Sequence, residues 1–213
     1  MSFINYATRE IQLKIVYYGC GRCGKTTNLQ TIHEKIADNS KGNLTSLATT
    51  QDRTLFFDFM PLVADAIQGF QTRFQMYTVP GQVMYNMTRR LVLRGVDGIV
   101  FVADSQWDKM AENVESFNNL LENLELQGDS LDNIPYVLQY NKRDLPKVAP
   151  ENYLEFVLNN REVRHPSISA AAPAGEGVFE TLNMIARLVL NDFVQKHGGA
   201  RAPQSQDSEL VLM

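Results

Sequence analysis

Residues 19–26 read GCGRCGKT and fit the pattern G-x-x-x-x-G-K-[ST]. They follow an apolar run over residues 11–18 and precede a helix-like stretch over residues 27–36, which is the strand–loop–helix setting that the pattern requires. Glycine permits positive φ angles, so successive backbone N–H groups can point at an anion at the start of a helix. The stretch therefore predicts a loop that holds the phosphates of a nucleotide.

The polar residues of this loop have candidate roles in phosphate binding. Lys25 would neutralise the β and γ phosphate oxygens, and the Thr26 hydroxyl would supply one of the octahedral oxygens around a nucleotide-bound Mg²⁺. A glycine-rich turn without a ligand is the alternative, but turn chemistry gives no reason for Lys-Thr at this place. The nucleotide-binding residues expected here are Gly19, Gly21, Arg22, Cys23, Gly24, Lys25, Thr26 and Thr27.

Composition limits the setting. The chain has 213 residues, of which 44% are hydrophobic, so we expect one core and one main domain. A formal net charge of −4 argues against nucleic-acid binding as the main function. The N-terminus shows no signal peptide pattern and no stretch reaches the length of a membrane span.

Both cysteines, Cys20 and Cys23, lie in the phosphate loop. Their C-x-x-C spacing is compatible with redox or metal chemistry, but no second cysteine pair or histidine cluster completes a zinc site. We expect them to pack within the loop, which also fits a reducing cytoplasm.

Strand-like and helix-like segments alternate along the chain, as in a mostly parallel sheet covered by helices on both faces. Strands are expected over residues 11–18, 55–59, 70–79, 98–103, 134–140 and 165–170, and helices over residues 26–37, 111–126, 150–160 and 178–195. A hairpin turn through residues 64–69 would join the second and third strands. The pattern predicts an α/β fold with a six-stranded sheet.

A second motif, NKRD at residues 141–144, follows the expected strand over residues 134–140. The Asp144 carboxylate can accept two hydrogen bonds from guanine, from N1–H and from the exocyclic amine, which adenine cannot donate. Asn141 would contact the base edge and fix the loop, while the stem of Lys142 packs over the ring. Alone the motif is weak, but ligands bind at the carboxyl edge of such a sheet, where the phosphate loop also lies.

Ser169 and Ala170 are expected to close the base site with backbone amides. Together the two loops and this pair predict a binding site that is specific for guanine nucleotides.

These motifs occur in the order found in Ras-like small GTPases, and the chain resembles the bacterial MglA group of that family. The strings that carry the narrower resemblance are RTLFFDF at 53–59, YTVPGQV at 77–83, RGVDGIVFVADS at 94–105 and NKRDLP at 141–146. The resemblance covers residues 1–196, expected to form a Ras-like G domain, and leaves residues 197–213 as a tail expected to be disordered. It implies a cytoplasmic GTPase that sets cell polarity and regulates gliding or motility driven by type IV pili.

The resemblance also implies a mechanism. Thr54 would join Thr26 on Mg²⁺ and meet the γ-phosphate, so that its loop orders with GTP and relaxes with GDP. Gly81 would sense the γ-phosphate through its N–H, and Gln82 would orient the attacking water. Arg53 would act as an arginine finger within the chain, with a surface arginine as the alternative. Slow hydrolysis that a partner accelerates is expected.

The chain departs from most small GTPases at Thr78, where an aspartate usually supports Mg²⁺ through a water. The MglA group shares this change. Either Mg²⁺ is then bound more weakly, or the carboxylate of Asp58 or Asp52 replaces the missing aspartate. The sequence leaves this choice open. Arg22 either contacts a phosphate oxygen or faces solvent.

The resemblance implies protein partners as well. A homodimeric roadblock-type protein similar to MglB would bind the switch face and accelerate hydrolysis, and polarity or motility effectors would read the GTP form. Contacts are expected around residues 45–53 and 83–90, where Met84 and Tyr85 either anchor partners or pack under the switch loop. No lipidation motif is present, so we expect a monomer that reaches a cell pole only through partners.

Two other function classes remain open. A GTP-gated scaffold with negligible hydrolysis would use the same binding site. A metabolic phosphotransferase would need the phosphate loop but neither NKRD at 141–144 nor Pro-Gly-Gln at 80–82.

Overall fold

The computed structural model describes residues 3–37, 40–48, 54–67 and 69–197. Its strands are β1 (Phe3–Asn5), β2 (Glu10–Tyr18), β3 (Thr45–Ala48), β4 (Thr54–Ile67), β5 (Phe70–Thr78), β6 (Gly98–Asp104), β7 (Tyr136–Asn141) and β8 (Ser167–Ser169). Its α-helices are α1 (Lys25–Lys35), α2 (Asn86–Leu93), α3 (Met110–Glu125), α4 (Glu151–Leu158) and α5 (Val178–His197). Short 3₁₀ helices are η2 (Val83–Tyr85), η3 (Trp107–Lys109) and η4 (Leu131–Asn133).

The strands form one mixed sheet in the order β3-β4-β5-β2-β6-β7-β8. The short strand β1 is not part of this order and adds a further pairing with β2. Strands β5, β2, β6, β7 and β8 run parallel, and β4, β3 and β1 add antiparallel pairs. The α/β fold class is confirmed. Within the described residues the sheet has eight strands rather than six, because β1 and β3 are too short to produce a sequence pattern.

Strand β4 is much longer than expected and continues to Ile67, so only two residues separate it from β5, which begins at Phe70. Pro61, which lacks an N–H, lies inside it. The Pro61 carbonyl accepts a hydrogen bond of 2.9 Å from the Gly42 N–H, on the edge away from β5. Because the nitrogen and carbonyl of one strand residue point to the same edge, the missing donor does not interrupt the β5 ladder.

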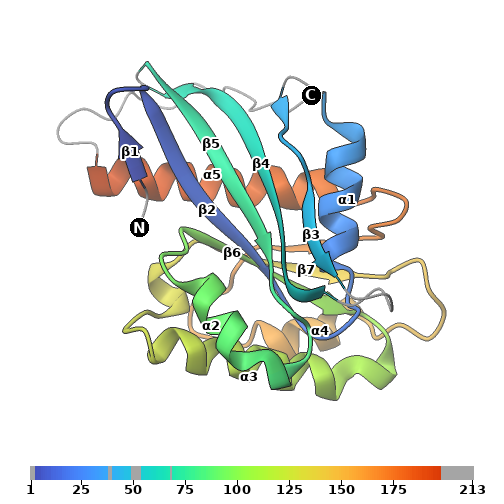
Figure 1. Cartoon of the computed structure of the whole chain (residues 1–213). Helices are drawn as coiled ribbons and strands as arrows, with labels where there is room; N and C mark the ends of the chain where they lie inside the picture. The colour runs from blue at the N-terminus through green and yellow to red at the C-terminus, as the bar shows by residue number, and fades with distance from the viewer. Residues whose placement is uncertain (1–2, 38–39, 49–53, 68, 198–213) are drawn as a thin grey trace.

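Side chains of β2 alternate between two hydrophobic cores, one on each face of the sheet. Ile15 and Tyr17 pack with α1 and α5, and Val16 and Tyr18 pack with α2, α3 and α4. Figure 1 shows the same arrangement, with α5 lying across one face and α2 to α4 on the other. Four of these helices match the sequence expectation to within three residues at each end.

The helix α2 was not expected. Its inner face carries a charged residue beside the buried Val92 and Leu93. Arg89 is fully buried, whereas Met87 and Leu91 are exposed. An amphipathic helix normally places charges outside, so the buried Arg89 and the exposed Met87 depart from that rule.

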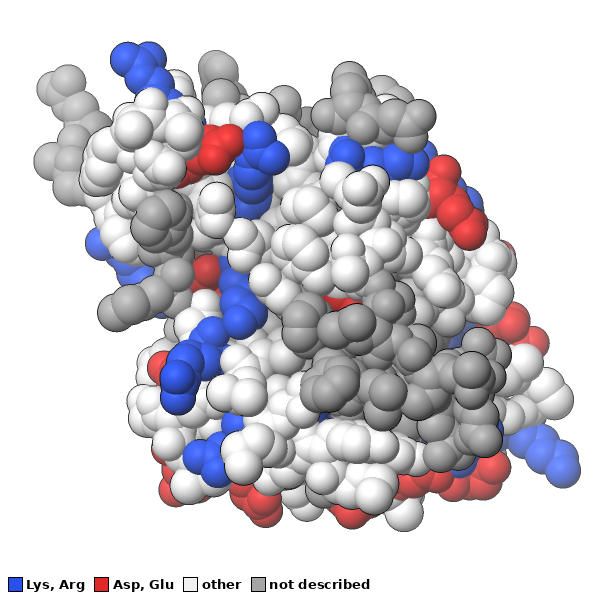
Figure 2. Space-filling model, viewed as in Figure 1, with Lys and Arg blue, Asp and Glu red and all other residues white. Residues whose placement is uncertain are grey.

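Charged side chains of both signs occur in several areas of the face shown in Figure 2. Among the helices of the described residues, none has the length and apolar character needed to cross a bilayer. The part of the tail beyond His197 lies outside the described residues.

Candidate functional site

The phosphate loop joins the end of β2 to the start of α1. Gly19 has φ 140° and Gly24 has φ 104°, which are conformations that glycine adopts readily. A Cβ on Gly19 would lie 2.1 Å from the carbonyl oxygen of Val102, and a Cβ on Gly24 would lie 2.1 Å from Nδ2 of Asn141. Both glycines are therefore required by conformation and by space.

Lys25 turns back into the mouth of the loop. Its ammonium donates hydrogen bonds to the carbonyls of Gly19 at 3.1 Å and Cys20 at 2.6 Å, and the residue is buried. Carbonyl dipoles hold the ammonium in place but leave its charge in the loop, where an anion would be stabilised.

Arg22 has φ 60° and an exposed side chain. An exposed guanidinium on this loop is compatible with both alternatives that the sequence left open.

The two cysteines are free and buried, as expected for loop packing. Burial would raise the pKa of Cys23, but the Cys20 thiol and the Lys25 ammonium stabilise the thiolate and lower that pKa below its usual value. The pKa of Cys20 is raised by the hydrogen bond with Cys23 and by burial. The described residues contain no group of three His, Cys, Asp or Glu side chains that could hold a metal ion.

A buried carboxylate, Asp58, lies beside the loop on β4. Its Oδ2 accepts hydrogen bonds from the hydroxyls of Thr26 at 2.6 Å and Thr78 at 2.7 Å, and its own N–H donates to Thr78 Oγ1 at 2.9 Å. Asp58, one of the two carboxylates that the sequence offered as a substitute, thus lies beside the Thr26 hydroxyl. Asp52 lies outside the described residues, and so does Arg53.

The segment after β5 lies against the phosphate loop. A Cβ on Gly81 would be 2.4 Å from the Cα of Gly21, so only glycine fits at this approach. Gln82 follows and is half-buried at the start of η2.

The backbone of Thr54 begins β4, and its side chain is among those not described. Thr27 lies in the first turn of α1.

Asn141 connects the base motif to the phosphate loop. Its Nδ2 donates to the Cys23 carbonyl at 2.8 Å, across 118 residues of sequence, and its Oδ1 accepts from the Ala172 N–H at 3.0 Å. The expectation that Asn141 fixes this loop is met, and the two motifs meet at the carboxyl edge of the sheet.

The remaining base-site residues flank Asn141. Lys142 has φ 65°, and its ammonium forms an ion pair with Asp104 at 2.6 Å, which holds the lysine stem across the site. Asp144 is exposed, so its carboxylate is accessible to a ligand.

The Ala170 N–H donates to the Tyr140 carbonyl at 2.9 Å, because β8 pairs with β7 up to this point. This differs from the expectation that Ala170 offers its amide to the base. The Ser169 hydroxyl donates to Glu151 at 2.6 Å.

Sequence reasoning missed Arg89. This buried side chain donates to the carbonyls of Pro80 at 2.8 Å and Gly81 at 2.9 Å, and it also reaches the Gly19 carbonyl at 3.2 Å. No signal in the sequence indicated this role, because arginine is almost never fully buried unless it is paired.

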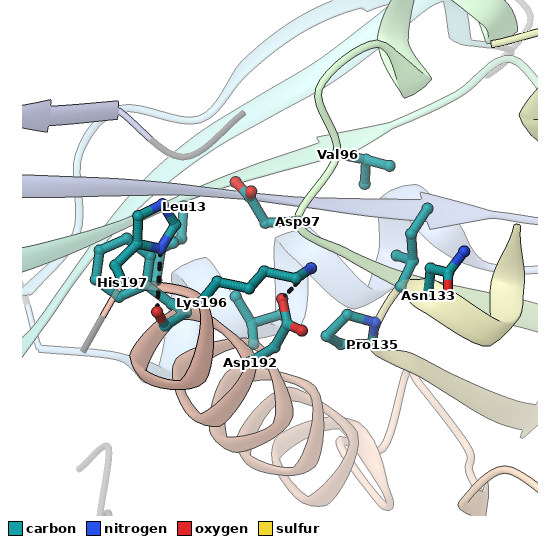
Figure 3. Close-up of a pocket in the computed structure, with 11 residues that line it drawn as sticks. Leu13, Val96, Asp97, Asn133, Pro135, Asp192, Lys196 and His197 are labelled. Atoms are coloured by element: carbon teal, nitrogen blue, oxygen red, sulfur yellow. Dashed lines mark hydrogen bonds and ion pairs between the residues drawn. The ribbon is translucent and has the colours of Figure 1, made fainter. Parts of the chain in front are cut away.

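A small hollow of about 50 Å³ lies elsewhere, at the amino ends of β6 and β7 (Figure 3). Asp192 and Lys196 form an ion pair of 2.7 Å on its rim. Ligand pockets are usually about 300–1,000 Å³. Its size, and its position at the opposite edge of the sheet from the phosphate loop, exclude it as the nucleotide site.

A phosphate loop and an Asn-Lys-x-Asp motif tied together at one edge of the sheet, with a Pro-Gly-Gln segment against the loop, define a small GTPase. Residues 2–189 match the sequence model of the ADP-ribosylation factor family. The chain is also 57% identical over 199 residues to the mutual gliding-motility protein MglA of Myxococcus xanthus strain DK1622, an alignment that covers 93% of this chain and all of that protein. The chain belongs to the ADP-ribosylation factor family and, within it, to the MglA group of small GTPases. The resemblance read from the motifs is confirmed.

We expect Asp144→Asn to weaken GTP binding and to admit xanthosine triphosphate, because the amide donates where the carboxylate accepts. Competition binding against a fluorescent GDP analogue measures both affinities. Asp108→Asn, an exposed substitution on η3, is the matched control and should leave both unchanged. An unaltered preference for GTP in Asp144→Asn would contradict the assignment of the base site.

Proposed function

We propose that this small GTPase is a molecular switch that binds and hydrolyses GTP and, in its GTP form, recruits effectors that control cell polarity and motility by gliding or type IV pili. The observation that carries the proposal is the tie from Asn141 to the Cys23 carbonyl, which joins the phosphate and base motifs in one site. The identity to a gliding-motility protein along nearly the whole chain supports the cellular role.

The proposed hydrolysis uses the segment that lies against the phosphate loop. Gly81 offers its N–H to the γ-phosphate, and Gln82, the next residue, orients the attacking water. Arg53, assigned from the sequence, stabilises the charge that develops on the transferring phosphoryl group. The backbone N–H groups of residues 19–26, together with Lys25, bind the phosphates, and Asp144 and Lys142 bind the base.

Gln82→Ala and Arg53→Ala should each retain GTP and hydrolyse it about a hundredfold more slowly, since each removes stabilisation specific to the transition state. Single-turnover phosphate release at saturating protein, alone and with a roadblock-type activator, measures the rate. Gln71→Ala, an exposed glutamine on β5, is the control. A variant that turns over at the parent rate removes its residue from the catalytic set, and negligible turnover of the parent under both conditions supports the GTP-gated scaffold instead.

We also propose that the nucleotide is bound with Mg²⁺ and that Asp58 supplies the carboxylate that Thr78 cannot. The donor set fits this ion, because Mg²⁺ prefers oxygen ligands and the Asp58 carboxylate lies 2.6 Å from the Thr26 hydroxyl. Thr26 and Thr54 would be direct ligands, and Asp58 would hold the Thr26 hydroxyl or a water of the ion. When bound, Mg²⁺ neutralises the β and γ phosphate oxygens.

Asp58→Asn keeps the shape of the side chain and removes its charge, so we expect the Mg²⁺ concentration for half-maximal nucleotide retention to rise about tenfold. Release of a fluorescent GDP analogue across a Mg²⁺ titration measures this. Asp108→Asn is again the control for loss of a carboxylate. An unchanged midpoint in Asp58→Asn would exclude a role for this carboxylate in holding the ion.

The surface proposed for partners is formed by η2 and α2. Met84, Met87 and Leu91 are 79%, 74% and 58% exposed and follow one another along this segment. Exposed apolar side chains next to the catalytic glutamine are suited to a partner that reads the nucleotide state, such as an MglB-like activator or an effector.

We also propose that the protein works in the cytoplasm as a monomer and that its partners recruit it to a cell pole.

Capture of an MglB-like activator on immobilised protein should be stronger with a non-hydrolysable GTP analogue than with GDP. Met87→Glu should weaken the GTP-state complex at least tenfold, because a charge would be buried at the contact. Leu126→Glu, which alters an equally exposed apolar residue just beyond α3, should not weaken it. Equal capture in both nucleotide states would contradict the switch.

A further inference from the structure

Arg89 is a buried cation on α2 that sequence analysis did not assign. Its relative exposure is 0%, and its hydrogen-bond partners among the described residues are neutral. The guanidinium donates to Pro80 O at 2.8 Å, Gly81 O at 2.9 Å, Gly19 O at 3.2 Å, Asn119 Oδ1 at 2.6 Å, Ser116 Oγ at 3.2 Å and Tyr18 Oη at 3.4 Å. It also lies over the ring of Tyr18, 4.7 Å from the centroid.

These contacts saturate the guanidinium. Arginine has five N–H donors in a rigid planar fork, and each of its three nitrogens has a partner here. A buried charge is costly unless its hydrogen bonds are satisfied, so any rotation of the side chain would leave donors and carbonyls unpaired. Arg89 therefore fixes the positions of the groups that it contacts.

Two of those groups set the direction of the peptide planes on either side of Gly81. The described residues contain no cis peptide bond, so in each of these planes the carbonyl and the following N–H point in opposite directions. The hydrogen bond from Arg89 Nε to the Pro80 carbonyl therefore directs the Gly81 N–H away from Arg89. The hydrogen bond from Nη2 to the Gly81 carbonyl directs the Gln82 N–H away from Arg89 in the same way.

The same nitrogen connects this segment to the phosphate loop. Nη2 donates both to the Gly81 carbonyl and to the Gly19 carbonyl, the first residue of the loop. The distance between the two segments is thereby fixed by one rigid group, which agrees with the close approach of Gly81 to Gly21.

The guanidinium itself is anchored to α3. Asn119 accepts from Arg89 and from the Tyr18 hydroxyl at 2.7 Å, and it donates to Asn86 at 3.1 Å. Asn123 donates to Asn86 at 2.7 Å. The network holds α2 on α3, so the orientation of Arg89 is also fixed by contacts outside the nucleotide site.

We propose that Arg89 is a positioning residue for GTP hydrolysis, which directs the Gly81 N–H to the γ-phosphate and keeps Gln82 at the attacking water without touching the nucleotide. This inference rests on the proposed roles of Gly81 and Gln82. It assigns the coupling between the phosphate loop and the catalytic segment to one side chain and its anchor on α3.

The test compares GDP binding, GTP binding and single-turnover hydrolysis in Arg89→Lys, which retains the charge and loses the fork. GDP affinity should stay within about threefold of the parent, because GDP lacks the γ-phosphate that Gly81 meets. The ratio of GTP to GDP affinity should fall about tenfold, and hydrolysis of bound GTP should slow about 10- to 100-fold. Arg94→Lys, an exposed substitution just after α2, is the matched control and should behave as the parent.

If Arg89 only stabilises the fold, Arg89→Lys will reduce the affinities for GTP and GDP by the same factor and leave the hydrolysis rate of bound GTP unchanged. This outcome overturns the proposal. An unaltered affinity ratio and rate in folded Arg89→Lys overturns it as well. Asn119→Ala, which retains Arg89 and removes its anchor on α3, should shift the affinity ratio and the rate in the same direction by a smaller factor. If Arg89→Lys does not fold, the test rests on Asn119→Ala. An affinity ratio and a hydrolysis rate equal to those of the parent protein then reject the proposal.

Gln82→Ala is measured in parallel to separate the two proposals. If Gln82→Ala hydrolyses GTP at the parent rate, the proposed role of Gln82 fails. The inference about Arg89 is then judged by the affinity ratio, which depends on Gly81.

Discussion

The side-chain amide of Asn141 holds the site together. It donates to the phosphate loop at Cys23 and accepts from the Ala172 N–H in the segment before α5. Three stretches that are distant in sequence are thereby fixed at the carboxyl edge of the sheet, and both partners are buried backbone groups that would otherwise remain unpaired. This contact thereby fixes the separation between the phosphate loop and the base motif.

Two buried cations contact the phosphate loop, and both donate hydrogen bonds to backbone carbonyls. Lys25 is held by carbonyls of the loop itself, and Arg89 by carbonyls of the loop and of Pro80 and Gly81. Carbonyl dipoles position a cation without cancelling its charge. The positive potential is therefore retained for an anionic ligand, while the backbone around that ligand is already in place.

Much of this arrangement was predictable where local spacing decides the chemistry. The glycines of residues 19–26 and the order of strands and helices follow from patterns within a few residues of each other, and the structure agrees with them. The length of β4 was not predictable, since Pro61 looks like a strand terminator and is tolerated only because its nitrogen faces away from β5. The helix α2 was missed because Arg89 occupies its inner face and Met87 its outer one.

The sequence by itself determined that the chain has a nucleotide-binding loop, a guanine-selective motif and the α/β fold that brings such motifs to one edge, because each depends on residue types at short, fixed spacing. Only the tertiary structure decided that Asp58 reaches Thr26, that the Ala170 amide is taken by Tyr140, and that Arg89 spans the loop and the Gly81 segment. These contacts join different strands, helices and loops across long sequence separations. Their partners are set by strand register and helix packing, which no local pattern contains.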